Sequence, residues 1–317
     1  MDEVWLSRLG YVLGECERPI EDSADLVTPA AELRRAGFGS QHVCADGTTA
    51  HDLAVRVTRA ATVAGPLDPD LLLHGTAIPR NASEGSERFD QTRDVKHLMD
   101  FSGSRLVADF GWDRAIVAGL TEQACTTVLG GWRMAAAMLS VEPGWRQAVC
   151  VTSDRFPPGA IREQAYNPIS DAATIAVLGR EATPGAYRLR TVHQVTNGGL
   201  GVISDTETAC TFFPWMHRAV TETLERAGVS AADLDWVAPQ NTHRVAWQVL
   251  GPLLGIPPER VHEGTRERLG HLVAGDNVAN LLDLAATGRL EPGQLVLLTA
   301  AGYGANWQCA VLEVGPR

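Results

Sequence analysis

Apolar runs and amphipathic, Ala-rich segments alternate along the chain, and this alternation predicts the fold class. Short continuous apolar runs are typical of buried strands, and they lie at 71–73, 148–152, 174–178, 236–238, 295–299 and 308–314. Segments with helical spacing lie at 50–64, 126–140, 214–228, 242–254 and 277–287. Because uninterrupted apolar strands separated by helices are usually covered on both faces, the pattern predicts an α/β protein with a largely parallel sheet.

Two stretches of the sequence are echoed about half a chain later. AATVAGPLDPDLLL at 60–73 and ETLERAGVSAADLDWV at 222–237 are each a helix end, an acidic connector and a buried strand. The closer echo joins GGWRMAAAMLSVEPGWRQAVCVT at 130–152 to NLLDLAATGRLEPGQLVLLT at 280–299, where Glu-Pro-Gly separates a helix from a strand. Because the echoes keep the same order, we expect two similar halves that share one core, residues 1–185 and 186–317.

Charge and composition exclude several function classes. The chain of 317 residues carries 27 basic and 38 acidic side chains, a net charge of −11, which argues against wrapping nucleic acid or binding anionic membrane surfaces. No apolar run reaches the roughly 18 residues of a membrane-spanning helix, and MDEVWLSRLG at the start does not read as a signal peptide. The six cysteines are scattered without a CxxC pair, which predicts reduced thiols in a cytoplasmic protein and no metal site.

The duplication predicts that candidate chemistry gathers at two matching helix starts. Cys125 lies near the start of the first Glu-Pro-Gly helix, and His271, Asp276 and Asn277 lie near the start of the second. Pseudo-symmetric helix starts in a duplicated fold tend to face each other. The N-terminal end of a helix favours a thiolate, and a histidine or amide opposite it can accept a proton or donate a hydrogen bond. The pattern alone leaves a small buried apolar role for Cys125 open.

Several segments resemble the β-ketoacyl-acyl carrier protein synthase III group of the thiolase superfamily, over nearly the whole length. EQACTTVLGG resembles the segment with the acylated cysteine, and GRLEPGQLVLLTAAGYGANWQCAVLEV resembles the C-terminal strands with their Gly-rich turn. The resemblance implies a five-layered αβαβα thiolase fold, a homodimer formed by extending the central sheets, and no cofactor. It also implies Cys125 as the acylated nucleophile, with the backbone N–H groups of Cys125 and Gly304 binding the thioester oxygen.

The departures from the family concern the partners of the cysteine. Where the family has a histidine directly after the proline of LDWVAPQNTHRVAW, this chain has Gln240, and His243 follows three residues later. His271 occupies the aligned position of the family's asparagine, and Asp276 stands where some acyl-transferring relatives carry an aspartate. We expect His271 to act as base or donor, oriented by Asp276, because the pseudo-symmetry directs it toward Cys125. His243 is the alternative.

These residues favour an acyltransferase. A Cys125 acyl-enzyme would take an acyl group from a carrier-protein or coenzyme A thioester and pass it to an oxygen, nitrogen or sulfur acceptor, in specialised metabolism. A histidine that accepts a proton suits such an acceptor. The alternatives are a decarboxylative carbon–carbon condensing enzyme, with Gln240 and His271 as donors, and a catalytically silent partner subunit.

The donor is expected to be a carrier protein. The family's early-loop arginine, which is associated with the coenzyme A nucleotide, is replaced by Gly39. Carrier proteins are acidic, so docking requires a local basic patch on this acidic chain. The candidate substrate- or carrier-binding residues are Arg34, Arg35, Arg162, Arg244 and Asn277.

Overall fold

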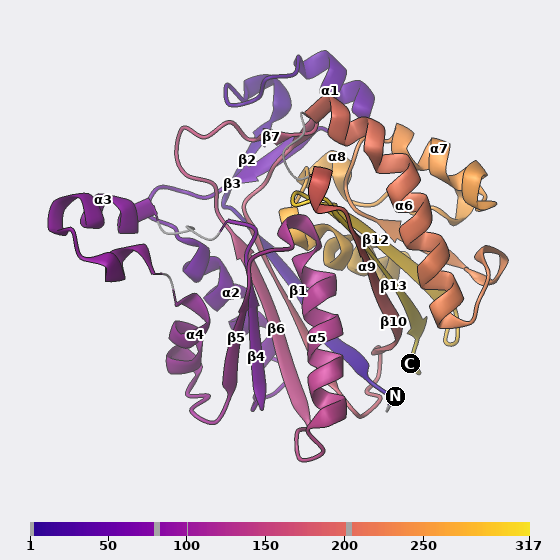
Figure 1. Ribbon diagram of the computed structural model, residues 1–317, viewed down its shortest axis with the longest axis horizontal. Helices are drawn as coiled ribbons and strands as arrows, with labels where there is room; N and C mark the ends of the chain where they lie inside the picture. The colour runs from indigo at the N-terminus through magenta and orange to yellow at the C-terminus, as the bar shows by residue number, and fades with distance from the viewer. Residues whose placement is uncertain (1–2, 79–82, 100, 201–204) are drawn as a thin grey trace.

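The computed structural model describes residues 3–78, 83–99, 101–200 and 205–317. Within these residues a nine-stranded mixed sheet runs in the order β11-β12-β13-β10-β1-β9-β6-β4-β5 (Figure 1). Its strands are β1 (Trp5–Leu13), β4 (Leu71–Gly75), β5 (Ile116–Leu120), β6 (Gln147–Asp154), β9 (Ala172–Gly179), β10 (Tyr187–Thr196), β11 (Trp236–Pro239), β12 (Leu295–Gly302) and β13 (Asn306–Val314).

The sequence-based prediction of a largely parallel sheet is wrong. The pairs β4–β5, β4–β6 and β11–β12 are parallel, whereas β1–β9, β9–β6, β1–β10, β10–β13 and β13–β12 are antiparallel. The chain returns from β12 to β13 through a tight turn at 303–305, a connection that only an antiparallel pair allows. An apolar run indicates that both faces of a strand are covered. It does not distinguish parallel from antiparallel pairing, because strands of either direction can be covered on both faces.

The two parts of the sheet have the same topology. In the first, β1-β9-β6-β4 are joined by two antiparallel pairs and then a parallel pair, and β10-β13-β12-β11 repeat this sequence of pairings. We propose that the halves meet at 185/186, in the turn between β9 and β10. Superposing residues 1–180 on 190–317 tests this boundary: the Glu-Pro-Gly turns at 142–144 and 291–293 should coincide.

Helices form three layers around the two parts of the sheet, which confirms the five-layered αβαβα order. Two central helices, α5 (Thr127–Val141) and α9 (Asp276–Ala286), contact strands of both halves. On the outer faces, α2 (Ala50–Thr62) and α4 (Ser102–Phe110) cover the first half, and α6 (Asp205–Ala227) and α7 (Val245–Leu254) cover the second (Figure 1). The central core packs Trp132 and Leu129 of α5 with Leu281 and Leu284 of α9. Burial of these apolar faces therefore fixes the two central helices relative to each other.

Short elements complete the fold. They are β2 (Cys16–Pro19), β3 (Ser40–Val43), β7 (Glu163–Gln164), β8 (Asn167–Pro168), α1 (Ala30–Ala36), α3 (Ser83–Thr92), α8 (Arg266–Leu269), and the 3₁₀ turns Ile20–Asp22, Val95–Leu98, η3 (Ala124–Thr126), Gly198–Leu200, Ala231–Asp233, Pro258–Arg260 and η7 (Val273–Gly275). Among the described helices, none has the length and apolar character needed to cross a bilayer. The described residues also contain no cluster of three or more metal-ligating side chains.

Candidate active site

The two matching helix starts meet at the centre of the molecule. The turn η3 leads into α5 and the turn η7 leads into α9, and the two turns contact each other. Each contains a residue with left-handed backbone: Ala124 has φ 44° and Val273 has φ 55°. Such a conformation costs an L-residue about 1–2 kcal/mol, and it persists where the surrounding structure holds it. The strain therefore lies at the two turns that carry the candidate chemistry.

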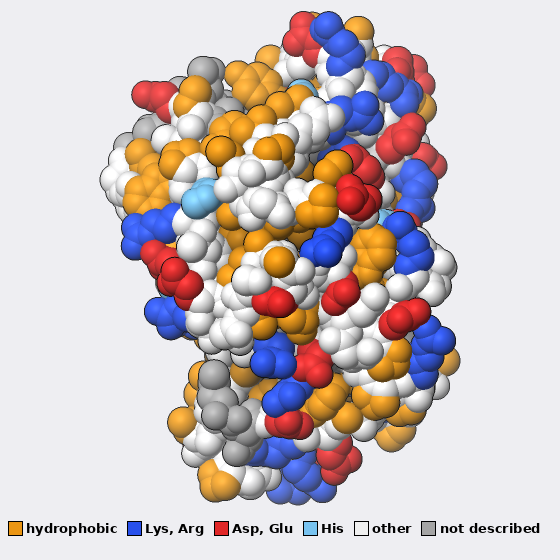
Figure 2. Space-filling model, turned by 90° about the vertical axis from the view of Figure 1, so that its right-hand side faces the viewer, with side chains coloured by type: hydrophobic (Ala, Val, Ile, Leu, Met, Phe, Trp, Pro, Cys, Tyr) orange, Lys and Arg blue, Asp and Glu red, His pale blue; other side chains and the backbone are white. Residues whose placement is uncertain are grey.

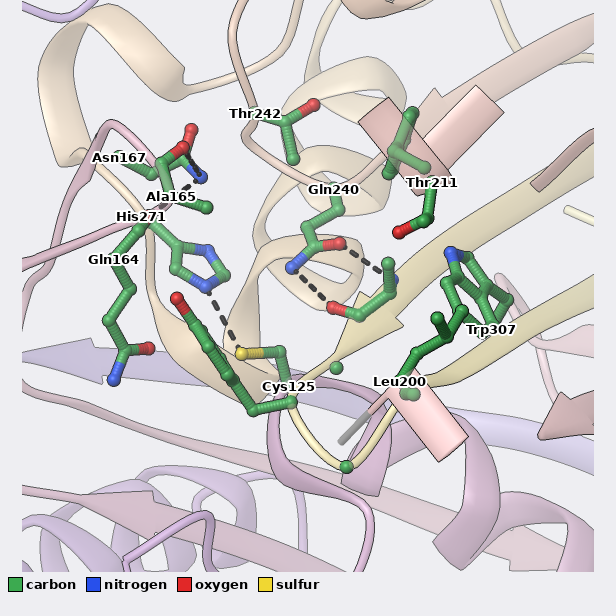
Figure 3. A pocket seen from close by; sticks show the side chains of 16 residues that line it. Cys125, Gln164, Ala165, Asn167, Leu200, Thr211, Gln240, Thr242, His271 and Trp307 are labelled. Carbon is green, nitrogen blue, oxygen red and sulfur yellow. Dashed lines mark hydrogen bonds between the residues drawn. The ribbon is translucent and has the colours of Figure 1, made fainter. Parts of the chain in front are cut away.

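Three buried side chains form one hydrogen-bonded chain at this junction. The Nε2 atom of His271 lies 3.3 Å from the Sγ atom of Cys125, and its Nδ1 atom lies 2.5 Å from Oδ2 of Asp276. Figure 3 shows the imidazole pointing at the sulfur. Cys125 is 5% exposed, His271 3% and Asp276 1%. The structure thus brings Cys125, His271 and Asp276 together in the order thiol, imidazole and carboxylate.

Asp276 is fixed as an acceptor by its neighbours. Its Oδ1 accepts the N–H of Leu272 at 2.7 Å, and its Oδ2 accepts the N–H of Asn241 at 3.0 Å in addition to the bond with His271. A carboxylate surrounded by donors requires the Nδ1–H tautomer of His271, so Nε2 faces the thiol and can accept its proton.

Electrostatics favour the protonated form of His271. Burial on its own lowers the pKa of an imidazole, but here the Asp276 carboxylate and the Cys125 sulfur outweigh it. The pKa of His271 is therefore raised well above its ordinary value. His271 is thus suited to accept a proton at Nε2, the nitrogen that faces the Cys125 sulfur.

The backbone of His271 is anchored to the first half of the chain. Its N–H donates to the Pro168 carbonyl at 2.8 Å, and its carbonyl accepts the Ser170 N–H at 2.9 Å. These bonds form a parallel bridge between Ile169 and His271. The segment that ends and follows the β7–β8 hairpin, residues 168–170, therefore holds the backbone of His271.

Two asparagines that the sequence reasoning missed support the loop before α9. Asn241 donates to the Thr265 hydroxyl at 3.0 Å and to the Gly270 carbonyl at 2.8 Å. Asn280 donates to the Asn241 side chain at 2.9 Å and accepts the Thr265 N–H at 2.8 Å. No local sequence signal identified them, because the two asparagines that contact each other are about 40 residues apart in the sequence.

Gln240 lines the cavity, and its carboxamide is occupied by the backbone. Its Nε2 donates to the Ala301 carbonyl at 3.1 Å, and its Oε1 accepts the Ala301 N–H at 2.7 Å (Figure 3). The side chain thus pairs with β12 in the manner of a peptide group. His243 is exposed, accepts the Val245 N–H at 3.2 Å and does not line the cavity. The structure brings neither of these side chains into contact with Cys125.

A cavity of about 100 Å³ opens in front of the Cys125 sulfur. The described residues lining it are Cys125, Gln164, Ala165, Asn167, Leu200, Thr211, Phe212, Gln240, Thr242, His271, Ala301, Gly302, Tyr303, Gly304, Ala305 and Trp307. Apolar and aromatic side chains therefore form the wall opposite the imidazole (Figure 3).

The turn between β12 and β13 needs glycine to approach the nucleophile. A Cβ at Gly302 would lie 2.5 Å from the Gln123 carbonyl and 3.2 Å from the Cys125 nitrogen. Gly304 has φ 87°, a conformation that L-residues rarely adopt. Both Cys125 and Gly304 border the cavity, as expected for two backbone donors.

Arg162 is not available for docking a carrier protein. The side chain is 4% exposed, and its guanidinium group donates two bonds, of 2.8 and 3.0 Å, to the Asp171 carboxylate. It also lies 3.6 Å from Asp25. The sequence prediction for Arg162 is corrected here, because a bidentate buried ion pair joins internal segments rather than forming a surface.

The other basic candidates lie at the surface. Arg34 forms a bidentate pair with Glu21 at 2.6 and 2.8 Å, which neutralises its charge locally. Arg35 is largely exposed, 3.9 Å from Glu32, and Arg244 is exposed near the start of α7. Arg35 and Arg244 therefore remain as candidates for contact with an acidic partner.

Asn277 does not face the cavity, which corrects its prediction as a substrate-binding residue. Its Nδ2 donates to the Ala238 carbonyl at 3.2 Å and to the Thr299 carbonyl at 3.1 Å. The side chain is buried and connects α9 to the neighbouring strands β11 and β12. Its role is to hold the helix start against the sheet.

Comparisons with known proteins point to one family. The family description "3-Oxoacyl-[acyl-carrier-protein (ACP)] synthase III C terminal" matches residues 224–314. A β-ketoacyl-[acyl-carrier-protein] synthase III of Rhizorhabdus wittichii is 26% identical over 308 residues, covering 89% of each chain. Among solved structures, ChlB3, described as an acyltransferase, is 22% identical with a TM-score of 0.82, over 99% of this chain and 98% of its own. The 3-oxoacyl-(acyl carrier protein) synthase III of Pseudomonas aeruginosa is also 22% identical, with a TM-score of 0.80 over 99% of both chains.

The matches agree with the fold. The fold and the relatives together support an enzyme that transfers or condenses acyl groups. The five-layered architecture, the family match at the C-terminal strands and the full-length relatives lead to one conclusion. The chain is similar over 89% of its length to β-ketoacyl-acyl carrier protein synthase III proteins, and it has the fold of their solved structures.

Proposed function

We propose that the protein is an acyltransferase that moves an acyl group from a thioester donor to an oxygen, nitrogen or sulfur acceptor through a Cys125 acyl-enzyme. The observation that carries this proposal is the chain from Cys125 through His271 to Asp276, with contacts of 3.3 and 2.5 Å. A nucleophile, a base and an orienting carboxylate in this order are the elements of covalent acyl transfer.

The reaction proceeds in two half-reactions. His271 takes the thiol proton of Cys125, and the sulfur attacks the thioester carbonyl, whose oxygen accepts bonds from the Cys125 and Gly304 N–H groups. The tetrahedral intermediate collapses, the C–S bond to the donor breaks, and the donor thiolate leaves with the proton from His271. In the second half-reaction His271 removes the proton of the acceptor, which attacks the acyl carbonyl and restores the Cys125 sulfur.

The geometry favours this chemistry over decarboxylative condensation. Condensation develops an enolate whose oxygen needs hydrogen-bond donors held at the carbonyl of the malonyl group. The Gln240 carboxamide is bonded at both ends to Ala301, and His243 does not line the cavity. The single imidazole at the sulfur is tied to a carboxylate, as suits a base. Condensation is the second candidate because the relatives in sequence carry the name of condensing synthases.

We propose a carrier-protein thioester as the preferred donor, in specialised metabolism such as polyketide or fatty-acid-derived pathways. Gly39 removes a possible nucleotide contact, and Arg35 and Arg244 remain at the surface for an acidic partner. On the face shown in Figure 2, basic and acidic side chains are interspersed, so docking would rely on a local patch rather than on the overall charge. Arg244→Glu should raise the KM for a carrier-bound donor more than for the coenzyme A thioester; equal effects would contradict carrier docking there.

We also propose a cytoplasmic homodimer. The edge strand β5 ends the sheet, and its Ile116 is 54% exposed beside a half-exposed Val117. An open apolar edge favours pairing with a second copy. A monomer at micromolar concentration in analytical ultracentrifugation would contradict this prediction.

Intact-protein mass spectrometry tests the proposed function. The protein is incubated with a panel of acyl thioesters, and then with hydroxyl, amine and thiol acceptors. We expect a mass increase equal to the acyl group, absent in Cys125→Ala, followed by loss of that mass when the acceptor is added. Stable acylation of Cys125→Ala, or acylation that no acceptor discharges, would refute it.

A further inference from the structure

One buried carboxamide connects the two backbone segments that would hold the thioester oxygen. Asn306, the first residue of β13, is 2% exposed. Its Oδ1 accepts the hydroxyl of Thr126, the residue after Cys125, and its Nδ2 donates to the Tyr303 carbonyl at 3.3 Å. Tyr303 precedes Gly304. A single short side chain therefore connects the turn η3, which contains Cys125 (the nucleophile turn), with the turn at 303–305 (the glycine turn).

Gln308 holds the same hydroxyl from a second direction. It lies two residues further along β13, so its side chain leaves the strand on the same face as that of Asn306. Its Nε2 donates to the Thr126 hydroxyl at 2.9 Å and to the Gln123 side chain at 3.2 Å. Gln308 and Thr126 are fully buried, so these bonds do not compete with water. Hydrogen bonds from the C-terminal half of the chain thus hold the nucleophile turn in place.

The turn that these hydrogen bonds hold is strained and closely packed. Ala124 has φ 44°, and such backbone persists only where contacts determine it. A Cβ at Gly302 would lie 3.2 Å from the Cys125 nitrogen, so the end of β12 touches the turn directly. Because the contact surfaces fit this closely, a change in the Asn306 bridge should shift the Cys125 N–H relative to the Gly304 N–H.

We propose that Asn306 is a positioning residue that sets the separation of the Cys125 and Gly304 N–H groups, the two donors for the oxyanion. The inference rests on the proposed function, because it concerns the same acyl-enzyme. Oxyanion donors must lie about 2.7–3.1 Å from the place where the negative charge develops, and the loss of one costs about 10²–10³ in kcat. Asn306 does not touch the substrate; it acts through Thr126 and Tyr303.

The test separates the oxyanion site from the reactivity of the sulfur. Acylation of Cys125 by a thioester passes through an oxyanion, whereas alkylation by iodoacetamide does not. In Asn306→Ala we expect kcat for acylation to fall about 10–100-fold, less than for a donor removed outright, with KM within about threefold of wild type. The rate of Cys125 alkylation, measured from pH 5 to 9, should stay within about threefold at every pH.

Two further variants sharpen the result. Asn306→Asp retains an acceptor for the Thr126 hydroxyl and loses the donor to the Tyr303 carbonyl, so it should lose acylation as well even if the alanine variant folds poorly. Gln194→Ala is the matched control, because Gln194 touches Gln308 at 3.0 Å at the outer end of the same cluster. It should leave both rates unchanged.

The acylation and alkylation rates together distinguish a failure of the Asn306 proposal from a failure of the proposed function. Equal loss of acylation and alkylation in the Asn306 variants would show an effect on the sulfur or the fold and would overturn the positioning role. Unchanged acylation would overturn it too, while leaving the proposed function intact. Absence of acylation in the wild type, with normal alkylation, would overturn both.

Discussion

Replacement of Asp276 by Asn changes one atom at the centre of the site, and the geometry specifies what must follow. The carboxylate accepts three N–H groups, from His271 and Asn241 on Oδ2 and from Leu272 on Oδ1. An Asn side chain has one acceptor oxygen. If that oxygen takes the Oδ2 place, its NH₂ group opposes the Leu272 N–H. If it takes the Oδ1 place, the NH₂ group opposes the Asn241 N–H and forces the other tautomer on His271, with a proton on the nitrogen that faces Cys125.

The magnitude follows from these contacts. A hydrogen bond to a charged group contributes about 1.5–3 kcal/mol, and each 1.36 kcal/mol is about tenfold in rate. Loss of the His271 partner alone therefore predicts about a 10–150-fold fall in the acylation rate. The wrong tautomer adds to this, up to about 10⁴-fold by analogy with serine hydrolase triads. We expect Asp276→Asn to lower acylation by about 10²–10⁴-fold, and a buried donor without an acceptor to lower the free energy of unfolding by about 1–3 kcal/mol.

The pH dependence has a defined sign. Asp276 raises the pKa of His271, so its removal lowers that pKa. A lower pKa means that the neutral base is present at lower pH. In single-turnover measurements of acyl discharge to an acceptor, the acid limb of the pH profile should therefore move to lower pH in Asp276→Asn, although the maximal rate falls.

The matched control is Asp283→Asn, which changes another His–Asp pair remote from the cavity, that of His262 at 2.9 Å. We expect its acylation rate to equal that of wild type. Rapid-quench mass spectrometry of the Cys125 adduct gives both rates. An acylation rate for Asp276→Asn within threefold of wild type, or an acid limb displaced to higher pH, would refute the reasoning.

Four other expectations follow from the same contacts. Cys125→Ala should retain the thermal unfolding midpoint within a few degrees and form no acyl adduct in mass spectra. His243→Ala should keep the rate of acyl transfer within about threefold of wild type, because His271 rather than His243 contacts Cys125; the same rate should fall sharply in a variant that lacks His271. The raised pKa of His271 stabilises the fold fully below pH ~6.5, and this contribution is lost as pH rises through the raised value, so wild type and His271→Gln should converge in urea unfolding at high pH. Arg162→Ala should lower the free energy of unfolding by about 3–5 kcal/mol in the same assay, because it leaves the buried Asp171 carboxylate without its ion-pair partner. A decrease below about 1 kcal/mol would contradict a structural role for this ion pair.

The sequence anticipated the parts of the fold that depend on local pattern. The Glu-Pro-Gly echo identified α5 with β6 and α9 with β12, because an amphipathic helix, a turn and an apolar strand each have a local signature. It missed β1 and β10, which pair with each other where the two halves meet, because most of their residues are half-buried and form no continuous apolar run. It also missed the direction of strand pairing, which depends on connections between strands rather than on their composition.

In the candidate site, too, the sequence predicted what depends on local pattern and missed what depends on tertiary contacts. Cys125 and His271 could be placed opposite each other because the duplication relates their helix starts, and the contact at 3.3 Å agrees with that placement. The burial of Arg162 against Asp171 and the position of Asn277 between two strands depend on tertiary contacts that no local pattern encodes. A surface role is the default for an arginine, so only the structure could identify its internal partner.

We propose that Cys125 delivers its acyl group to a heteroatom without carbon–carbon bond formation. The most direct measurement loads Cys125 with an acyl group, adds either a malonyl thioester labelled at its free carboxylate or a hydroxyl, amine or thiol acceptor, and records released labelled carbon dioxide together with the mass of the protein. We expect the heteroatom acceptor to remove the acyl mass, while the malonyl thioester releases no carbon dioxide above the level of Cys125→Ala. One equivalent of carbon dioxide for each acyl group lost would contradict it.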